Sequence, residues 1–343
     1  DIVANDNQVR PVYATPGAGS VPSGTEVALT TATDEATIYY TVDGTDPTET
    51  TGTEYTDPIM LEKDTTIKAI AYKDGFDESN ITTFTYNVYD AERGLQIHDI
   101  QGPGHTSPYV NHVVEDIEGI VTYTYEIRGA NYFHLQAEED NYDGNKDTSE
   151  AIIVYTGRAE NIDVGNKVKV TGEVDEYYID GYDDKNETDL SVTQINARND
   201  RGGMIEVIED HVDLPTPITI TSSDIPNQVI GKEGFNTFDR EKNAMDYWES
   251  LEGMLVEIPP AKAVAPQEHG DLVVVTEEFE TDTIHGGLLL EKDKPNAQFI
   301  QYKLYPNNNA RNLKVKTGDV FTKDITGVVN YGFQNYKVYA DLE

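Results

Sequence analysis

The chain has 343 residues, of which 63 are aspartate or glutamate and only 25 are lysine or arginine, so its formal net charge is −38 at pH 7. Such an acidic surface repels nucleic acids and anionic membranes at long range, and it suits divalent cations or a saline medium. Cysteine is absent, which excludes disulfides and thiolate metal sites. Hydrophobic residues make up 37% of the chain, enough to fill about two or three cores of ordinary size.

Residues 1–11 form a polar N-terminal segment, and residues 12–90 are expected to form the first β-domain. Its candidate strands alternate in polarity and close on an Asp-Gly pair or on a turn rich in proline and threonine. They cover residues 38–44, 65–75 and 84–86. Short strands with such turns predict an antiparallel β-sandwich.

The order of motifs in this domain resembles a known family. Residues 22–27 (Pro-Ser-Gly-Thr-Glu-Val) precede residues 39–48 (Tyr-Tyr-Thr-Val-Asp-Gly-Thr-Asp-Pro-Thr), and the strand Thr-Ile-Lys-Ala-Ile-Ala follows at residues 66–71. This order resembles the small immunoglobulin-like repeat at the C-terminus of chitobiases and β-hexosaminidases. The resemblance implies an Ig-like spacer or attachment module, located outside the cell or at its surface.

The rest of the chain carries one strand pattern twice, which predicts a β-domain present in two copies, residues 91–200 and 201–343. In each copy, a strand that opens on Glu-Gly is followed by one in which a Gly-Asn or Gly-Asp turn precedes alternating apolar residues and a Thr-Gly break. These segments are residues 117–122 and 164–174 in the first copy and residues 251–256 and 317–329 in the second. Glycines in such strands permit the sharp bends of a small barrel.

These two copies resemble part of a larger protein class. In the first copy, residues 96–108 with their Gly-Pro-Gly-His-Thr-Ser-Pro stretch, and the strand at residues 148–155, are similar to the oligonucleotide-binding-type (OB-like) domain that precedes the catalytic domain of large secreted bacterial nucleases. The second copy resembles the segment that follows, most clearly at residues 247–256. The expected fold is therefore all-β, an Ig-like β-sandwich followed by two OB-like β-barrels.

In those nucleases a metal-dependent phosphodiesterase domain comes next, whereas this chain ends at Glu343. Phosphodiester hydrolysis there would need an asparagine and a glutamate on a metal, with a His-Asp pair that activates water. The strand motifs that carry those residues do not occur here. Neither do a Gly-x-Ser-x-Gly elbow, a His-Glu-x-x-His helix or a phosphate-binding Gly-x-x-x-x-Gly-Lys loop. We expect a chain without catalytic activity.

An acidic loop at residues 139–150 has the spacing of a calcium loop. Aligned on Gly144, it places oxygen ligands at the first, third, fifth, ninth and twelfth positions. These ligands are Glu139, Asn141, Asp143, Asp147 and Glu150. Lys146 departs from the motif and the flanks have strand patterns, so a Ca²⁺ site and a hydrated acidic hairpin both remain open. A weaker cation cluster is predicted from Asp180, Asp183, Asp184, Asn186 and Glu187.

Three evenly spaced histidines, His98, His105 and His112, lie around Gly-Pro-Gly and Ser-Pro pairs. In such a loop, equal spacing does not place side chains on one face, so we expect an ordinary turn. A zinc site would need these side chains to converge in space.

The barrel resemblance also raises nucleic-acid binding. OB-like barrels bind single strands with exposed aromatic rings and a basic groove. The candidates are Tyr123, Tyr125, Tyr132 and Phe133 for stacking and Lys167 and Lys169 for phosphates. Two lysines offer little against the net acidity, and tyrosine in strands more often packs than recognises a ligand. The composition therefore disfavours direct binding.

One helix is predicted at residues 239–250, because Ala244, Met245, Trp248 and Leu251 recur at helical spacing. Trp248, the single tryptophan, is expected to cover the core of the second barrel.

Two functions follow from these patterns. In the first, the chain is the non-catalytic front of a secreted nuclease, which positions a catalytic domain or an extracellular polymer. In the second, it is an extracellular structural protein that assembles with itself by edge-strand pairing and calcium. Residues 1–10 are a candidate donor strand for such assembly.

Overall fold

The structure is a computed structural model, and it describes residues 8–90, 92–157, 162–178, 189–231, 234–236, 238–289, 296–304 and 312–341. The chain divides into two compact units, residues 1–95 and 96–343, and each is described by itself. No helix in the described part of the chain is long and apolar enough to cross a membrane.

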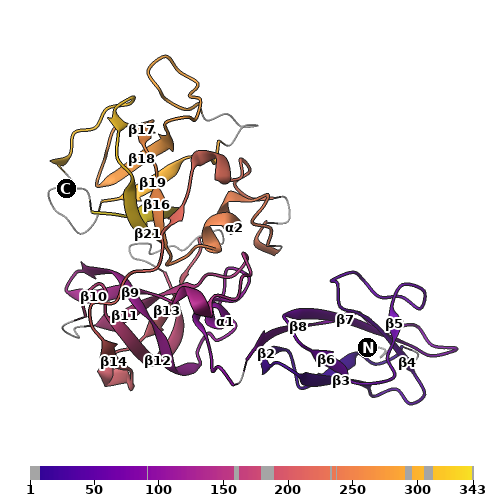
Figure 1. Cartoon of the computed structure of the whole chain (residues 1–343). Coiled ribbons are helices and arrows are strands. Elements are labelled where there is room, and N and C mark those ends of the chain that lie inside the picture. Colours follow the sequence, from indigo (N-terminus) through magenta and orange to yellow (C-terminus); the bar gives the residue numbers. More distant parts are fainter. Residues whose placement is uncertain are drawn as a thin grey trace, which may run out of the picture. The chain divides into compact units, whose positions relative to one another are not determined.

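The first unit is a β-sandwich (Figure 1). Its three-stranded sheet has the order β1-β3-β6 and its five-stranded sheet the order β2-β8-β7-β4-β5. The strands are β1 (Val12–Thr15), β2 (Gly19–Pro22), β3 (Thr25–Thr31), β4 (Thr37–Thr41), β5 (Thr53–Glu54), β6 (Ile59–Leu61), β7 (Thr65–Tyr72) and β8 (Thr82–Tyr89). Alternating residues of the two sheets, among them Val27, Ile67 and Tyr86, are buried between them. The predicted Ig-like sandwich is confirmed.

The end of the predicted donor segment belongs to this same sandwich. Val9 is buried in its core, and its backbone N–H donates to the Asp77 carbonyl at 2.9 Å. Residues 1–7 lie outside the described part of the chain. Part of the segment predicted to donate a strand to a neighbouring molecule is thus packed within its own domain.

The second unit begins with a closed five-stranded barrel. β9 pairs with β10 and β12, while β13 closes the barrel by pairing in parallel with β11 and antiparallel with β12. The strands are β9 (Val113–Ile127), β10 (Ala130–Gln136), β11 (Ala151–Gly157), β12 (Lys167–Tyr177) and β13 (Val192–Asn196). A parallel pair between the third and fifth strands is the closure expected of an OB-like barrel.

A sixth strand, β14 (Met204–Glu209), extends this sheet by pairing with β12. The boundary predicted at residues 200 and 201 therefore separates β14 from its partner strand. The reason is that β14 follows β13 along the same edge of β12, after a single 3₁₀ turn at η2 (Asn199–Arg201).

The second barrel repeats the same closure with interrupted strands. Pro259 and Pro260 divide its first strand into two pieces, β16 and β17, because proline cannot donate to a β-ladder. The strands are β15 (Ile218–Thr219), β16 (Leu255–Ile258), β17 (Ala261–Ala263), β18 (Asp271–Thr276), β19 (Ile300–Lys303), β20 (Val320–Phe321), β21 (Ile325–Gly332) and β22 (Asn335–Tyr339). β19 pairs in parallel with β22, and β21 joins β22 to β16. The two OB-like barrels predicted from the repeat are confirmed by this pairing.

The repeated Thr-Gly break has the same structural cause in both barrels. A β-carbon at Gly172 would lie 2.6 Å from the Asn196 carbonyl oxygen, and one at Gly327 would lie 2.4 Å from the Tyr339 carbonyl oxygen. Both distances are far inside van der Waals contact. Only glycine lets the fourth strand approach the fifth so closely where the barrel closes.

The helices are short. α2 (Ala244–Glu249) has six residues, fewer than the twelve predicted, because the N–H groups of Ala244 and Met245 donate to the carbonyls of Gln228 and Val229, which fixes the start of the helix. Residues 251–253 form a turn before β16, where a strand was expected. The helices not predicted are α1 (Ile97–Gln101), the 3₁₀ turns η1 (Glu139–Asn141), η3 (Ser222–Asp224) and η4 (Gly234–Asn236), and η2.

Candidate functional site: the contact between the two barrels

Aromatic side chains of β9 form the apolar part of the contact between the barrels. Tyr123 and Tyr125 pack against Leu255, Val328 and Tyr339 of the second barrel. The rings of Tyr125 and Tyr339 meet edge to face, with 5.5 Å between their centroids, a favoured aromatic geometry. A second cluster continues the contact, because Ala151, Ile153 and Val192 share a core with the second barrel.

This packing corrects the predicted nucleic-acid platform. Tyr123 and Tyr125 are 9% and 4% exposed and face the second barrel, so they offer no ring to a base. Phe133 is buried as well. Tyr132 stays half-buried, stacked between Tyr125 and Tyr155 at centroid distances of 5.1 and 4.9 Å. The strand pattern identified the aromatic face, but a neighbouring barrel covers it.

The two predicted phosphate-binding lysines are engaged in ion pairs. Lys167 Nζ lies 2.5 Å from a carboxylate oxygen of Glu138, and Lys169 Nζ lies 3.1 Å from one of Glu118. These contacts, led by the hydrogen bond to the carboxylate in each case, raise the pKa of both lysines. Their positive charge is therefore matched locally.

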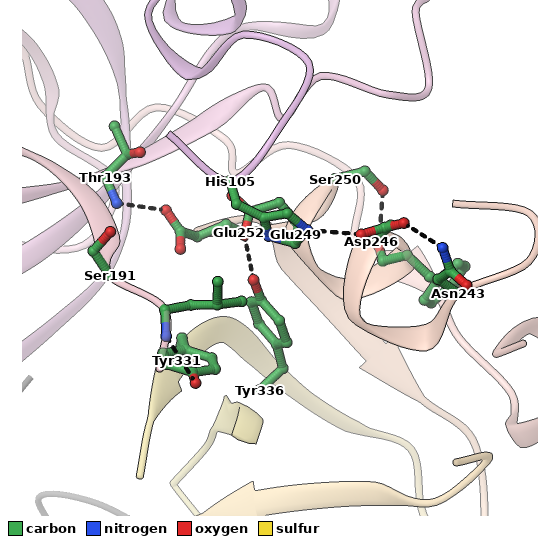
Figure 2. Close-up of polar contacts among 12 residues, drawn as sticks. His105, Ser191, Thr193, Asn243, Asp246, Glu249, Ser250, Glu252, Tyr331 and Tyr336 are labelled. Atoms are coloured by element: carbon green, nitrogen blue, oxygen red, sulfur yellow. Dashed lines mark hydrogen bonds and ion pairs between the residues drawn. The ribbon is translucent and has the colours of Figure 1, made fainter. Parts of the chain in front are cut away.

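A histidine whose side chain is 9% exposed fixes the polar part of the contact. The loop of residues 102–108 carries His105 into the contact, where its Nε2 lies 2.7 Å from Asp246 Oδ1 and its Nδ1 lies 2.9 Å from Glu249 Oε2 (Figure 2). Both carboxylates project from α2. We call His105, Asp246 and Glu249 the histidine clamp.

The histidine clamp holds a charged imidazole. Burial alone would lower the pKa of His105, but the hydrogen bonds and charges of Asp246 and Glu249 outweigh burial and raise that pKa to about 9. The same contact keeps the pKa of Asp246 below its ordinary value against the opposing effect of burial. Both imidazole nitrogens therefore carry protons at neutral pH, which suits them to hold two carboxylates and not to accept a proton from a substrate.

Two further carboxyl groups, of the buried Glu252 and the half-buried Glu176, lie near the histidine clamp. Glu252 Oε1 accepts the Thr193 N–H at 2.9 Å, whereas its Oε2 is buried without a hydrogen-bond partner. Burial, followed by the charges of Glu249 and Glu176, raises the pKa of Glu252 well above its usual value. Glu176 accepts hydrogen bonds from the Ser107 N–H and the Ser191 hydroxyl, both at 2.7 Å.

Sequence reasoning missed the histidine clamp because its halves are far apart in the chain. A signal was present: Asp246, Glu249 and Glu252 recur every three residues and so lie on one side of α2 and the turn that follows it. The clamp also joins residues 96–108 to residues 247–256.

The predicted calcium loop is only partly assembled. Asp143 and Glu150 come together with His98, with one ligand atom of each within 4.8 Å of the others. Glu139 instead accepts the Thr216 N–H at 2.7 Å, and neither it nor Asp147 belongs to this group. The five predicted residues thus do not converge as a single ligand set, because Glu139 and Asn141 form the 3₁₀ turn η1.

The group of His98, Asp143 and Glu150 fits calcium poorly as it stands. His98 Nδ1 lies 2.8 Å from Glu150 Oε2, and the oxygens of Asp143 accept from the Asn145 N–H and the Thr148 hydroxyl. Burial opposes a proton on His98, but the hydrogen bond and charge of Glu150 outweigh it and raise the pKa of His98. An imidazolium already neutralises part of the acidic charge, and imidazole is a ligand for transition metals rather than calcium.

A cavity of about 480 Å³ lies between the acidic loop and α2. Its walls include Tyr142, Thr148, Glu150, Arg240, Tyr247 and Met254. Within it, the Arg240 guanidinium lies 5.3 Å from the centre of the Tyr247 ring. The weaker acidic cluster, Asp180 to Glu187, lies outside the described residues. His112 is exposed and takes no part in the contact.

Comparisons with known proteins match parts of the chain. The family described as "Fn3 associated" matches residues 27–86, and the "Domain of unknown function (DUF8508)" matches residues 207–343. A search of curated proteins found no match. Among solved structures, the crystal structure of fission yeast Pot1 with single-stranded DNA is similar, with 12% identity and a TM-score of 0.20, over 68% of this chain and 80% of that one. The OB-like assignment rests on the strand pairing and not on this similarity.

Proposed function

We propose that this chain is a non-catalytic, extracellular region of a secreted nuclease-like protein, in which two fused barrels act as a rigid body that positions a neighbouring domain or a polymeric substrate. The observation that carries the proposal is the contact between the barrels. The tyrosine face of β9, which the sequence offered as a nucleic-acid platform, is here packed against the second barrel through Tyr123 and Tyr125, and the histidine clamp holds it there.

The clamp favours a fixed geometry over a flexible one. Buried ion pairs contribute little net stability when compared with apolar packing, but removing one partner leaves a buried charge unpaired, at a cost of about 3–5 kcal/mol. Sliding or opening of the barrels would separate His105 from Asp246 and Glu249. A single docked arrangement is what a spacer needs to hold a catalytic domain at a set distance.

The experiment is a comparison of backbone NMR relaxation in the two barrels, together with a nuclease assay on the purified chain. One rotational correlation time for residues 96–343, and no cleavage of DNA or RNA with magnesium, manganese or calcium, are expected. Two separate correlation times would contradict the rigid body. Cleavage of DNA or RNA that co-purifies with the chain, and that a substitution in the chain abolishes, would contradict the non-catalytic role.

A second candidate function, self-assembly outside the cell, is favoured by β14. This strand pairs only with β12 among the described strands, and its Met204, Val207 and Ile208 are 53%, 40% and 39% exposed. In an antiparallel pair of β14 with its own copy centred between Glu206 and Val207, each glutamate would face an apolar residue and not another glutamate. The occupant that fits this edge is a second copy of the chain.

Sedimentation velocity separates the two functions. The spacer predicts a monomer in millimolar calcium and in excess chelator alike, whereas the structural protein predicts larger species, favoured by calcium because it screens the charge of −38. A Val207→Lys variant should abolish those species if β14 forms the contact. Assembly that survives this substitution would exclude β14 as the edge.

A further inference from the structure

A second cavity, of about 440 Å³, lies at one end of the first barrel. Three separate parts of the chain form it: the β9–β10 turn with Arg128 and Gly129, the end of β11 with Tyr155 and Gly157, and the segment after β13 with Arg198 and Asp200. Among the described residues that line this cavity, two are arginines and one is an aspartate, in a chain whose overall charge is −38. This local excess of positive charge runs against the composition.

Arg198 is built into the cavity wall. Its guanidinium carbon lies 5.6 Å from the centre of the Tyr155 ring, and its side chain is 26% exposed. A β-carbon at Gly157 would lie 3.0 Å from Arg198 Cδ, so the glycine leaves room for the arginine stem. The ring of Tyr155 is itself held by stacking on Tyr132 at 4.9 Å.

The hydrogen-bonding capacity of Arg198 is not used up. Its Nε is buried and has no hydrogen-bond partner, although Asp200 Oδ1 lies 3.5 Å away as an ion-pair partner that is 73% exposed. A buried N–H donor without an acceptor is costly, and the rest of the side chain is 26% exposed and lines the cavity, where the guanidinium can meet an oxyanion. A planar guanidinium fork matches the oxygens of phosphate.

We propose that this cavity binds a phosphate group, with Arg198 as the fixed donor and Arg128 of the β9–β10 turn as a second cation in the lining. Phosphate can reach the cavity as the free ion or as the terminal phosphate of a nucleic acid strand. The second source rests on the proposed nuclease-like function. Binding of the free phosphate ion does not rest on that function, so an experiment can exclude the nucleic-acid source and still support the phosphate site.

Isothermal titration of the full chain with inorganic phosphate tests the cavity, and titration with a short oligothymidylate, with and without a 5′-phosphate, tests the source. Phosphate should bind, and Arg198→Gln should weaken binding about tenfold or more, as expected for the loss of a charge-assisted hydrogen bond. Arg201→Gln is the matched control, because Arg201 lies three positions away but outside the cavity lining.

The outcomes are distinct. No phosphate binding by the wild-type chain, or equal loss in the Arg198→Gln and Arg201→Gln variants, would overturn the proposal. Phosphate binding without a preference for the 5′-phosphorylated strand would support the cavity and overturn the nucleic-acid source. Arg198→Lys keeps the stem and the charge but lacks the planar guanidinium fork, so it should also bind more weakly. Emission from Trp248, buried in the same unit, confirms that each variant folds.

Discussion

His105 and Asp246 lie 141 positions apart in the sequence, yet 2.7 Å separates the imidazole Nε2 from the carboxylate Oδ1. Because one residue belongs to the first barrel and the other to the second, this pair ties the docking of the barrels to a single protonation state. The stability of the unit should therefore depend on the protonation of His105.

The first prediction concerns that pH dependence. The pKa of His105 rises from 6.5 to about 9 on folding, so its stabilisation is complete below about pH 6.5 and is lost as pH rises through about 9. A shift of this size corresponds to roughly 3 kcal/mol. Urea unfolding followed by Trp248 emission should show this loss, and His105→Gln should remove it while lowering stability by about 3 kcal/mol near pH 6. The exposed His112→Gln variant should behave as wild type.

The second prediction concerns Glu252. Its pKa is raised above the ordinary 4.5 on folding, so it too contributes stability at low pH that is lost as pH rises through the raised value. Glu252→Gln keeps the acceptor for the Thr193 N–H and removes the carboxyl group whose ionisation burial opposes, so the free energy of unfolding at neutral pH should increase by about 1 kcal/mol. Glu257→Gln on the neighbouring strand serves as the control. A fall in stability for Glu252→Gln would mean that the charged form is needed.

The fold was predictable from local patterns, and the site was not. The strands around Gly119 and Gly172 follow from alternation and turn residues, which each segment carries by itself. By contrast, no local pattern tells whether Tyr125 faces solvent or another barrel. The clamp requires contact between His105 and Asp246, and the sequence of a loop does not tell in which direction a histidine side chain points.

The acidic loop shows a related limit. Ligand spacing around Gly144 predicts calcium only if the backbone follows the calcium-loop path, and the 3₁₀ turn at Glu139 to Asn141 takes another course. His98, which the spacing placed in an ordinary turn, lies on α1 and reaches Glu150 across 52 positions. Sequence spacing cannot reveal a partner at that separation.

The third prediction concerns barrel closure. Gly327→Ala would place a methyl group 2.4 Å from the Tyr339 carbonyl oxygen, and β21 and β22 must separate to accept it. We expect a loss of about 2 kcal/mol or more in the free energy of unfolding, measured by urea titration. Gly17→Ala is the control, because no atom lies within 4 Å of its added β-carbon. Equal free energies of unfolding for both variants would show that β21 and β22 can separate without loss of stability.

The last prediction concerns calcium at Asp143 and Glu150. Since hydrogen bonds already engage both carboxylates and His98 supplies a positive charge, millimolar calcium should change the melting temperature of the wild-type chain by less than about 1 °C relative to chelator. His98→Gln removes that charge and leaves two carboxylates unneutralised, so calcium should then stabilise the protein measurably. If calcium raises the melting temperature of the wild type by several degrees and Glu150→Gln abolishes that rise, the loop of residues 139–150 binds calcium as predicted, because only a bound ion links those two results.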